Sequence, residues 1–162
     1  MRAVRAGDAD AHWAMLADPK VMAFVHSDPL GREDAWRRLL AAPGMWPMVG
    51  YGYWVIERKA DGRFIGQLGF AQFRRDMEPS LDGLPEMGWM LCSDVHGQGY
   101  AGEAAIVALG WADRALAGQQ IVAIIAEGNE RSMRLAERLG FRRAERSVHK
   151  GDDVLIFRRD PA

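Results

Sequence analysis

The fold is decided by the stretch from Glu86 to Glu127, EMGWMLCSDVHGQGYAGEAAIVALGWADRALAGQQIVAIIAE. An apolar run over residues 86–92 predicts a strand, and the apolar run over 120–127 predicts a buried strand. Between them, small and apolar residues recur at helical spacing over 101–116, which predicts a helix packed closely on a sheet. Because strand–helix–strand crossovers are right-handed, this stretch predicts two parallel neighbouring strands.

The rest of the chain surrounds this unit with further helices and strands. Before it, the pattern predicts helices over 8–17 and 32–42, a loop over 43–52, and strands over 51–57 and 63–73 joined by an Asp-Gly turn. After it, the pattern predicts a helix over 130–139 and a hairpin of strands 141–150 and 153–159. The order predicts one mixed α/β domain over residues 1–162, with an antiparallel front half.

Composition and charge exclude several classes of protein. The 162 residues carry 21 basic and 22 acidic side chains, a net charge of −1, so a nucleic-acid binder with a broad basic face is not expected. The apolar run Ile121–Ala126 is too short to span a bilayer, and the N-terminus lacks the apolar core of a signal peptide. The single cysteine, Cys92, has no intramolecular partner. We expect a cytoplasmic protein with no nucleic-acid or membrane partner.

A glycine-rich turn, His96–Gly102 (HGQGYAG), lies between the first strand and the helix of this unit. Glycine lets a phosphate approach the main chain, and a helix start offers unpaired N–H groups. The turn therefore predicts a pyrophosphate or similar anion, with a ligand-free tight turn as the alternative. A dinucleotide fingerprint is rejected, because Ser93–His96 separate the motif from its strand and only 60 residues follow Gly102.

Five segments resemble one family in the same order. They are Asp18–Met22 (DPKVM), Ile65–Gly69 (IGQLG), Glu86–Leu91 (EMGWML), Gly97–Ala104 (GQGYAGEA), and Asn129-x-x-Ser132 followed by LGF at 139–141. Together they resemble the GNAT superfamily of N-acetyltransferases, and within it the RimJ/RimL type, which acetylates ribosomal-protein N-termini. The resemblance implies a mixed, mostly antiparallel sheet of six to seven strands, splayed in the middle, with about four flanking helices. It also implies acetyl-CoA as co-substrate and a primary amine as acceptor.

The resemblance assigns residues to the coenzyme. The pyrophosphate is expected on the backbone N–H groups of Gly97, Gln98, Gly99, Tyr100, Ala101 and Gly102. The pantetheine arm is expected along the strand end at Met90 and Leu91, where a backbone N–H also meets the oxyanion. Asn129 is expected to bind pantetheine or departing CoA and to cap the next helix. Two positions depart from the family pattern: His96 replaces Arg or Gln, and Gly102 replaces a frequent Thr.

The resemblance also suggests two catalytic residues. Glu86 is the candidate base, acting directly or through water, and its alternative is a solvated carboxylate at a strand end. The usual acidic tyrosine is replaced by Ala136, so Ser132 is the candidate that hydrogen-bonds the departing thiolate. An ordinary serine in the first turn of a helix is its alternative.

Other side chains bear on the acceptor, metals and thiol chemistry. Trp46, in the loop over 43–50, is expected to line the acceptor pocket or to pack in the core. Asp76, Glu78 and Asp82, together with Glu86, could attract a cationic amine or form a solvated loop. The four histidines, His12, His26, His96 and His149, lack the spacing of metal ligands, so no metal is expected. Cys92 is interpreted as a buried structural thiol.

The sequence therefore predicts an N-acetyltransferase that uses acetyl-CoA, with a protein N-terminal α-amine as preferred acceptor. A small amine, such as a polyamine, an amino acid or an aminoglycoside, is the alternative acceptor. A catalytically silent acyl-CoA-binding module and a ligand-free adaptor are the alternative functions, and a homodimer is left open.

Overall fold

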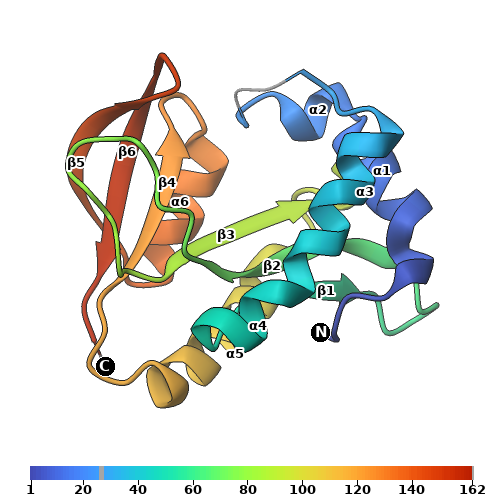
Figure 1. Ribbon diagram of the computed structural model, residues 1–162, viewed down its shortest axis with the longest axis horizontal. Coiled ribbons are helices and arrows are strands. Elements are labelled where there is room, and N and C mark those ends of the chain that lie inside the picture. The colour runs from blue at the N-terminus through green and yellow to red at the C-terminus, as the bar shows by residue number, and fades with distance from the viewer. Residues whose placement is uncertain (26–27, 162) are drawn as a thin grey trace. The chain divides into compact units, whose positions relative to one another are not determined.

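The computed structural model describes residues 1–25 and 28–161 (Figure 1). The helices are α1 (Ala9–Leu16), α2 (Pro19–Met22), α3 (Arg32–Ala41), α4 (Met45–Val49), α5 (Tyr100–Ala115) and α6 (Glu130–Arg138). The strands are β1 (Tyr53–Glu57), β2 (Phe64–Ala71), β3 (Glu86–Leu91), β4 (Ile121–Ala126), β5 (Arg142–His149) and β6 (Asp152–Arg159). Three short 3-10 helices are η1 (Ala6–Asp8), η2 (Ala42–Gly44) and η3 (Ser93–Val95).

The six strands are hydrogen-bonded in the order β1-β2-β3-β4-β6-β5. The pairs β1–β2, β4–β6 and β5–β6 are antiparallel, whereas β3 and β4 are parallel, with Glu86 opposite Val122. This order confirms the predicted mixed, mostly antiparallel sheet and the parallel pair on either side of α5. It also places Glu86 where β3 begins to pair with β4.

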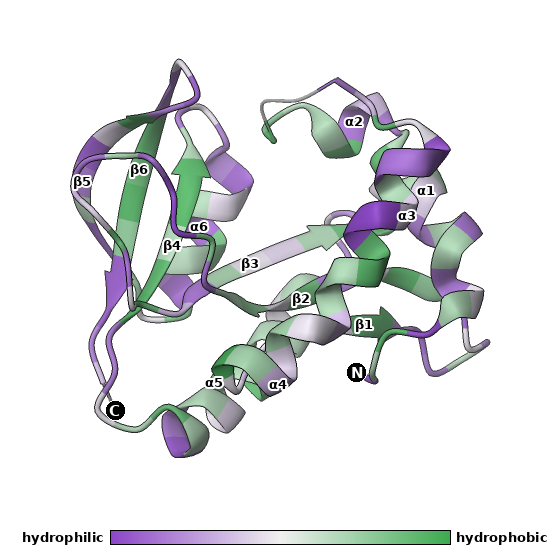
Figure 2. Cartoon of the chain, viewed as in Figure 1, coloured by the Kyte–Doolittle hydropathy of each residue, from purple (hydrophilic) through white to green (hydrophobic). Residues whose placement is uncertain are grey.

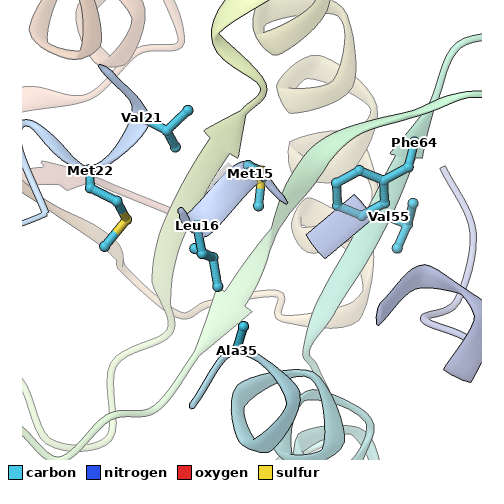
Figure 3. Packing of buried hydrophobic residues seen from close by; sticks show 7 residues of the cluster. All are labelled: Met15, Leu16, Val21, Met22, Ala35, Val55 and Phe64. Atoms are coloured by element: carbon cyan, nitrogen blue, oxygen red, sulfur yellow. The ribbon is translucent and has the colours of Figure 1, made fainter. Parts of the chain in front are cut away.

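The chain forms two compact units, and the first comprises residues 1–69 and 89–104. Its core is built from α1, α2, α3, β1 and β2, as Figure 3 shows. The buried side chains of this core are Met15, Leu16, Val21, Met22, Ala35, Val55 and Phe64. The side-chain Nε1 of Trp13 donates to the Leu30 carbonyl at 3.2 Å, which joins α1 to the residues just before α3. The N-terminal helices are therefore packed on the β1–β2 hairpin.

The second unit comprises residues 70–88 and 105–162. Strand β4 and the middle of β6 are strongly apolar (Figure 2), and Val154–Phe157 in β6 are all buried. Strand β5 is more polar and lies at the edge of the sheet, next to β6. The β5–β6 turn has positive φ at both Lys150 (54°) and Gly151 (91°), the conformation that matches the twist of a two-residue hairpin. The predicted terminal hairpin is confirmed, and the single domain over 1–162 stays a prediction.

One local expectation was wrong. Residues 43–52 were expected to form a loop, but η2 and α4 occupy most of them and only Gly50, at φ 84°, ends the helical path. Proline is tolerated in the first turn of a helix, so Pro43 and Pro47 do not prevent this. No element was predicted from the sequence for residues 19–22, where the short helix α2 begins directly at Pro19. Asp18 caps this helix by accepting a 2.8 Å hydrogen bond from the Lys20 N–H.

Over the described ranges 1–25 and 28–161, no helix combines the length and apolar character needed to cross a membrane.

His12 gives a prediction about stability. Its side chain is buried in α1, and neither ring nitrogen has a hydrogen-bond partner within the described part of the chain. Burial, and secondarily the charge of Arg38, lowers the pKa of His12 from 6.5 to about 4. Between these two pH values His12 is protonated in the unfolded chain but neutral in the folded chain. The free energy of unfolding therefore falls as the pH is lowered from 6.5 towards 4.

His12→Leu removes this titration, so the variant should lose less stability than the wild type over that interval. Urea unfolding at a series of pH values measures the difference. Parallel stability curves for the two proteins would contradict the burial of a neutral His12.

Candidate functional site

The turn before α5 exposes main-chain N–H groups. The first helical hydrogen bond runs from Glu103 N–H to the Gly99 carbonyl at 3.0 Å. The N–H groups of Tyr100, Ala101 and Gly102 precede it and have no acceptor within the helix. Gly97 and Gly99 have φ of 75° and 88°, and a Cβ on either would meet nothing within 4 Å. Open space, bare main chain and a helix start together fit the pyrophosphate of a coenzyme.

Side chains next to this turn hold its main chain. The Gln98 side-chain Nε2 donates to the Asp94 carbonyl at 3.0 Å. The Nε2 of His96 lies 2.9 Å from the Leu91 carbonyl, so it carries the proton and donates. His96 and Gln98 therefore stabilise the backbone path of the turn with their side chains. The main-chain N–H of Gln98 belongs to the predicted cradle, whereas the main-chain N–H of His96 donates to the Ser93 carbonyl at 3.2 Å.

Asp18 joins the α2 cap to the segment before the turn. Its Oδ1 caps α2, and its Oδ2 accepts a hydrogen bond from the Ser93 hydroxyl in η3. The Ser93 hydrogen bond, with a smaller effect from the Lys20 N–H, lowers the pKa of Asp18 below its usual range. The sequence marked Asp18 only as part of the DPKVM motif, and nothing in the local pattern indicated its contact with Ser93, 75 positions away.

Two arginines missed by the sequence analysis lie near the same turn. Arg63, at the end of the β1–β2 hairpin turn, binds Asp94 with N–O distances of 2.6 and 3.1 Å. Arg58, on the other side of that turn, is held by Asp61, and its pKa is raised mainly by that contact and slightly by Tyr100. The local pattern predicted only a hairpin turn here. The structure shows that the hairpin turn carries two arginines, of which Arg63 contacts Asp94 in η3, just before the glycine-rich turn.

The end of β3 is constrained on both sides of Leu91. A Cβ on Gly66 would lie 2.5 Å from the Met90 carbonyl oxygen, so only glycine allows β2 to approach this closely. The Cys92 N–H donates to the Ile65 carbonyl at 2.9 Å. Burial raises the pKa of the Cys92 thiol, which therefore stays protonated at neutral pH. This agrees with the interpretation of Cys92 as a structural thiol.

Glu86 is buried and paired. Only 8% of its surface is exposed, and Arg75 donates to both carboxylate oxygens at 2.7 Å. The guanidinium also lies 2.8 Å from His149 Nε2 and 4.6 Å from the Phe73 ring centroid. The alternative of a solvated strand-end carboxylate was therefore wrong, because the β2–β3 loop folds Arg75 back over Glu86.

The same geometry corrects the expected group of four carboxylates. Asp76, Glu78 and Asp82 are exposed on the β2–β3 loop, but Glu86 is buried and its charge is matched by Arg75. Three of the four carboxylates therefore face solvent.

Asn129 caps α6 as expected. Its side-chain oxygen accepts a 3.2 Å hydrogen bond from the Ser132 N–H, which satisfies one of the unpaired N–H groups at the helix start. Ser132 is half-buried in the first turn, and Ala136, one turn further, is fully buried. The capping interaction is confirmed, whereas the coenzyme role of Asn129 and the catalytic role of Ser132 stay predictions.

Trp46 lies on α4 and packs against neighbours in the first unit. Its ring meets Trp54 edge to face, with centroids 4.9 Å apart at 65°. A Cβ on Gly52 would lie 2.6 Å from the indole Nε1, so glycine there makes room for the ring. The packing of Trp46 is thus established, and its role in the acceptor pocket stays a prediction.

Among residues 1–25 and 28–161, no three His, Cys, Asp or Glu side chains gather in a way that could hold a metal ion. His26 lies outside the described residues.

Comparisons with known proteins agree on one family. A model described as "Acetyltransferase (GNAT) domain" matches residues 1–142. The structure of a Bordetella pertussis protein assigned to the GNAT acetyltransferases is 33% identical, with a TM-score of 0.85, and covers 98% of this chain and 93% of that one. The uncharacterised protein YkkB of Bacillus subtilis is 33% identical over 93 residues, which are 56% of this chain. The chain spans about half the length of that curated relative, 52%.

Two structures of lower identity share the fold. RimL, a ribosomal L7/L12 α-N-protein acetyltransferase, is 15% identical with a TM-score of 0.76, over 98% of this chain and 87% of its own. Spermidine N-acetyltransferase from Vibrio cholerae, solved with CoA and spermine, is 17% identical with a TM-score of 0.75, over 99% and 94%. The expected GNAT fold is confirmed.

The geometry of the turn predicts that Gly99→Val weakens acetyl-CoA binding by about tenfold or more. Valine at φ 88° is strained, and its side chain enters the open space above the N–H groups. Isothermal titration calorimetry with acetyl-CoA measures the effect. Gly83→Val is the matched control, because Gly83 has φ 84° and open surroundings on the β2–β3 loop. If the Gly99 variant and the wild type bound acetyl-CoA with equal affinity, the turn would not be part of the coenzyme site.

Proposed function

Because the chain belongs to the GNAT family of acetyltransferases, we propose that it moves an acetyl group from acetyl-CoA to the α-amine of a protein N-terminus. Membership of the family supports the expected enzyme class, an N-acetyltransferase, with acetyl-CoA as the donor. The proposal adds the acceptor and the residues that act on it.

The observation that carries the proposal is the exposed main chain at the start of α5. Gly97 and Gly99 leave open space in the turn from Gly97 to Gly102, and the N–H groups of this turn would hold the coenzyme's pyrophosphate. When bound, the coenzyme supplies an acetyl group activated as a thioester. Met90 and Leu91, further back along the same chain in β3, would run beside its pantetheine arm.

The preference for an α-amine follows from proton affinity. At pH 7 about one lysine-type amine in 2,500 is neutral, against about one α-amine in ten. Only the neutral amine attacks a thioester, so an α-amine needs much less help from a base. A site with one carboxylate that is already paired with a cation suits this less demanding acceptor.

Glu86 would serve as the base through an ordered water. Each carboxylate oxygen has two lone-pair sites, so oxygens that accept from Arg75 can still accept from a water molecule. That water would take the proton from the attacking amine. Ser132 would donate its hydroxyl hydrogen bond to the departing thiolate, Asn129 would bind the pantetheine or departing CoA, and Trp46 would line the acceptor pocket.

A small cationic amine is the second candidate acceptor. The observation that favours it is the group of exposed carboxylates on the β2–β3 loop, Asp76, Glu78 and Asp82. Such a group attracts a polycation through water, although salt screens exposed charges strongly. Acceptor-dependent release of CoA thiol, measured with a panel of peptides and small amines, separates the two candidates. Tight coenzyme binding with no thiol release from any acceptor would instead favour a silent acyl-CoA-binding module.

Glu86→Gln should lower turnover most for acceptors of high pKa. With a lysine-only peptide, blocked at its N-terminus, kcat should fall by about 10²-fold or more, whereas a peptide with a free N-terminal alanine should be slowed less. Glutamine keeps one oxygen towards Arg75, so the fold is preserved. Glu137→Gln, an exposed carboxylate on α6, is the matched control. Equal slowing of both peptides would show that Glu86 is not the base.

A further inference from the structure

A chain of polar contacts runs from Glu86 to the edge strand β5. Arg75 donates from Nε and Nη2 to the two oxygens of Glu86, both at 2.7 Å. Its third nitrogen, Nη1, lies 2.8 Å from Nε2 of His149, the last residue of β5. Glu86 is 10% and Arg75 23% exposed at the side chain. All three residues belong to the second compact unit.

The direction of each hydrogen bond follows from the donor and acceptor chemistry. Guanidinium can only donate, so His149 Nε2 must accept with its lone pair, and the imidazole is neutral with its proton on Nδ1. Because guanidinium is planar, fixing Nη1 fixes the plane in which Nε and Nη2 point. The Phe73 ring, 4.6 Å from the guanidinium carbon, covers one face of that plane.

We propose that His149 is a positioning residue for Glu86: through Arg75, it holds the carboxylate in the orientation that a base needs. The inference rests on the function proposed above for Glu86. His149 touches no reacting atom in this scheme. Its effect reaches the reaction only by way of the guanidinium, so removing either Arg75 or Glu86 should make His149 irrelevant to turnover.

Protonation of His149 would break this arrangement. The imidazolium would present an N–H to a guanidinium that has no acceptor, with two positive charges at the distance of a hydrogen bond. The charged groups around His149 are Arg75 from the β2–β3 loop, Glu86 behind it on β3, its cross-strand partner Asp152 on β6, and Lys150 next in the chain. Imidazoles change charge between about pH 5 and 8, so the positioning of Glu86 should weaken in acid.

A purely structural role for the contact is the alternative. The loop is also fastened to β5 by the Ser147 hydroxyl, which donates to the Glu78 carbonyl. Figure 1 shows the loop running beside β5. Because this second attachment exists, losing the His149 contact should leave the loop in place and change mainly the orientation of Arg75.

Substitutions of His149 test the proposal through kinetics. His149→Leu should lower kcat for an alanine-initiated peptide about three- to tenfold, with the KM for acetyl-CoA unchanged. His149→Gln offers a carbonyl oxygen to Arg75 and should restore most of kcat. Glutamine does not titrate, so this variant should also keep its turnover below pH 6, where the wild type declines.

The double variant separates positioning from structure. In the Glu86→Gln background, His149→Leu should cause no further loss of kcat. Equal losses in the two backgrounds would overturn the proposal, as would the same acid decline in wild type and His149→Gln. If Glu86→Gln alone leaves turnover unchanged, the proposed function of Glu86 as the base is wrong. If Glu86→Gln lowers turnover and His149→Leu does not, only the positioning role of His149 is wrong.

A measurement without turnover gives an independent test. Nitrogen-15 NMR of the imidazoles should find neutral His149 as the Nδ1–H tautomer. Glu86→Gln removes the anion that balances Arg75, so the His149 titration midpoint should move down by about 0.5 pH or more. Asp82→Asn, an exposed carboxylate on the same loop, should leave the midpoint unchanged. If Glu86→Gln left the titration midpoint of His149 unchanged, the proposal would be overturned without any assumption about the acceptor.

Discussion

The unpaired N–H groups at the start of α5 are the constraint on which the donor half of the site depends. A helix cannot satisfy its own first N–H groups, so side chains, water or a ligand must do so. Here the chain places glycine at positions 97 and 99, and the side chains of His96 and Gln98 bond to the carbonyl groups of Leu91 in β3 and Asp94 in η3. The N–H groups before Glu103 are thus left for a ligand, and the helix dipole gives them a preference for negative charge.

Glu86 shows how a buried carboxylate can be kept in a site at a tolerable cost. A lone carboxylate at 8% exposure would be strongly destabilised, and a bidentate arginine removes most of that penalty. The pair also limits the chemistry. A carboxylate fixed on two sides keeps its direction, which favours transfer of a proton along one path through water. For the proposed base, the fitting acceptor is an α-amine, of which about one in ten is neutral at pH 7, rather than a lysine-type amine, of which about one in 2,500 is.

The sequence predicted what depends on local pattern and missed what depends on distant contacts. The parallel pair β3–β4, helix α5 and the hairpin β5–β6 follow from apolar runs and turn residues. Helix α4 was missed because Pro43-Gly44 indicated the end of the preceding helix and the segment that follows is rich in Met, Trp and Gly. Pro43 and Pro47 nevertheless lie where a helix tolerates proline. Arg75 and His149 are 74 positions apart, and Asp18 and Ser93 are 75 apart. No spacing rule relates residues that only the folded chain brings together.

The charge balance around Glu86 also bears on which amines the protein favours. Because Arg75 balances the charge of the buried carboxylate, attraction for a polycation on the β2–β3 loop would come from the exposed Asp76, Glu78 and Asp82. Exposed charges act through water and are screened within about 8 Å at physiological salt. A polyamine held by such charges would bind much more weakly as salt is added, whereas an α-amine selected by its low proton affinity would not. If the proposed site is correct, the buried ion pair shifts selection from the charge of the acceptor to the protonation state of its amine.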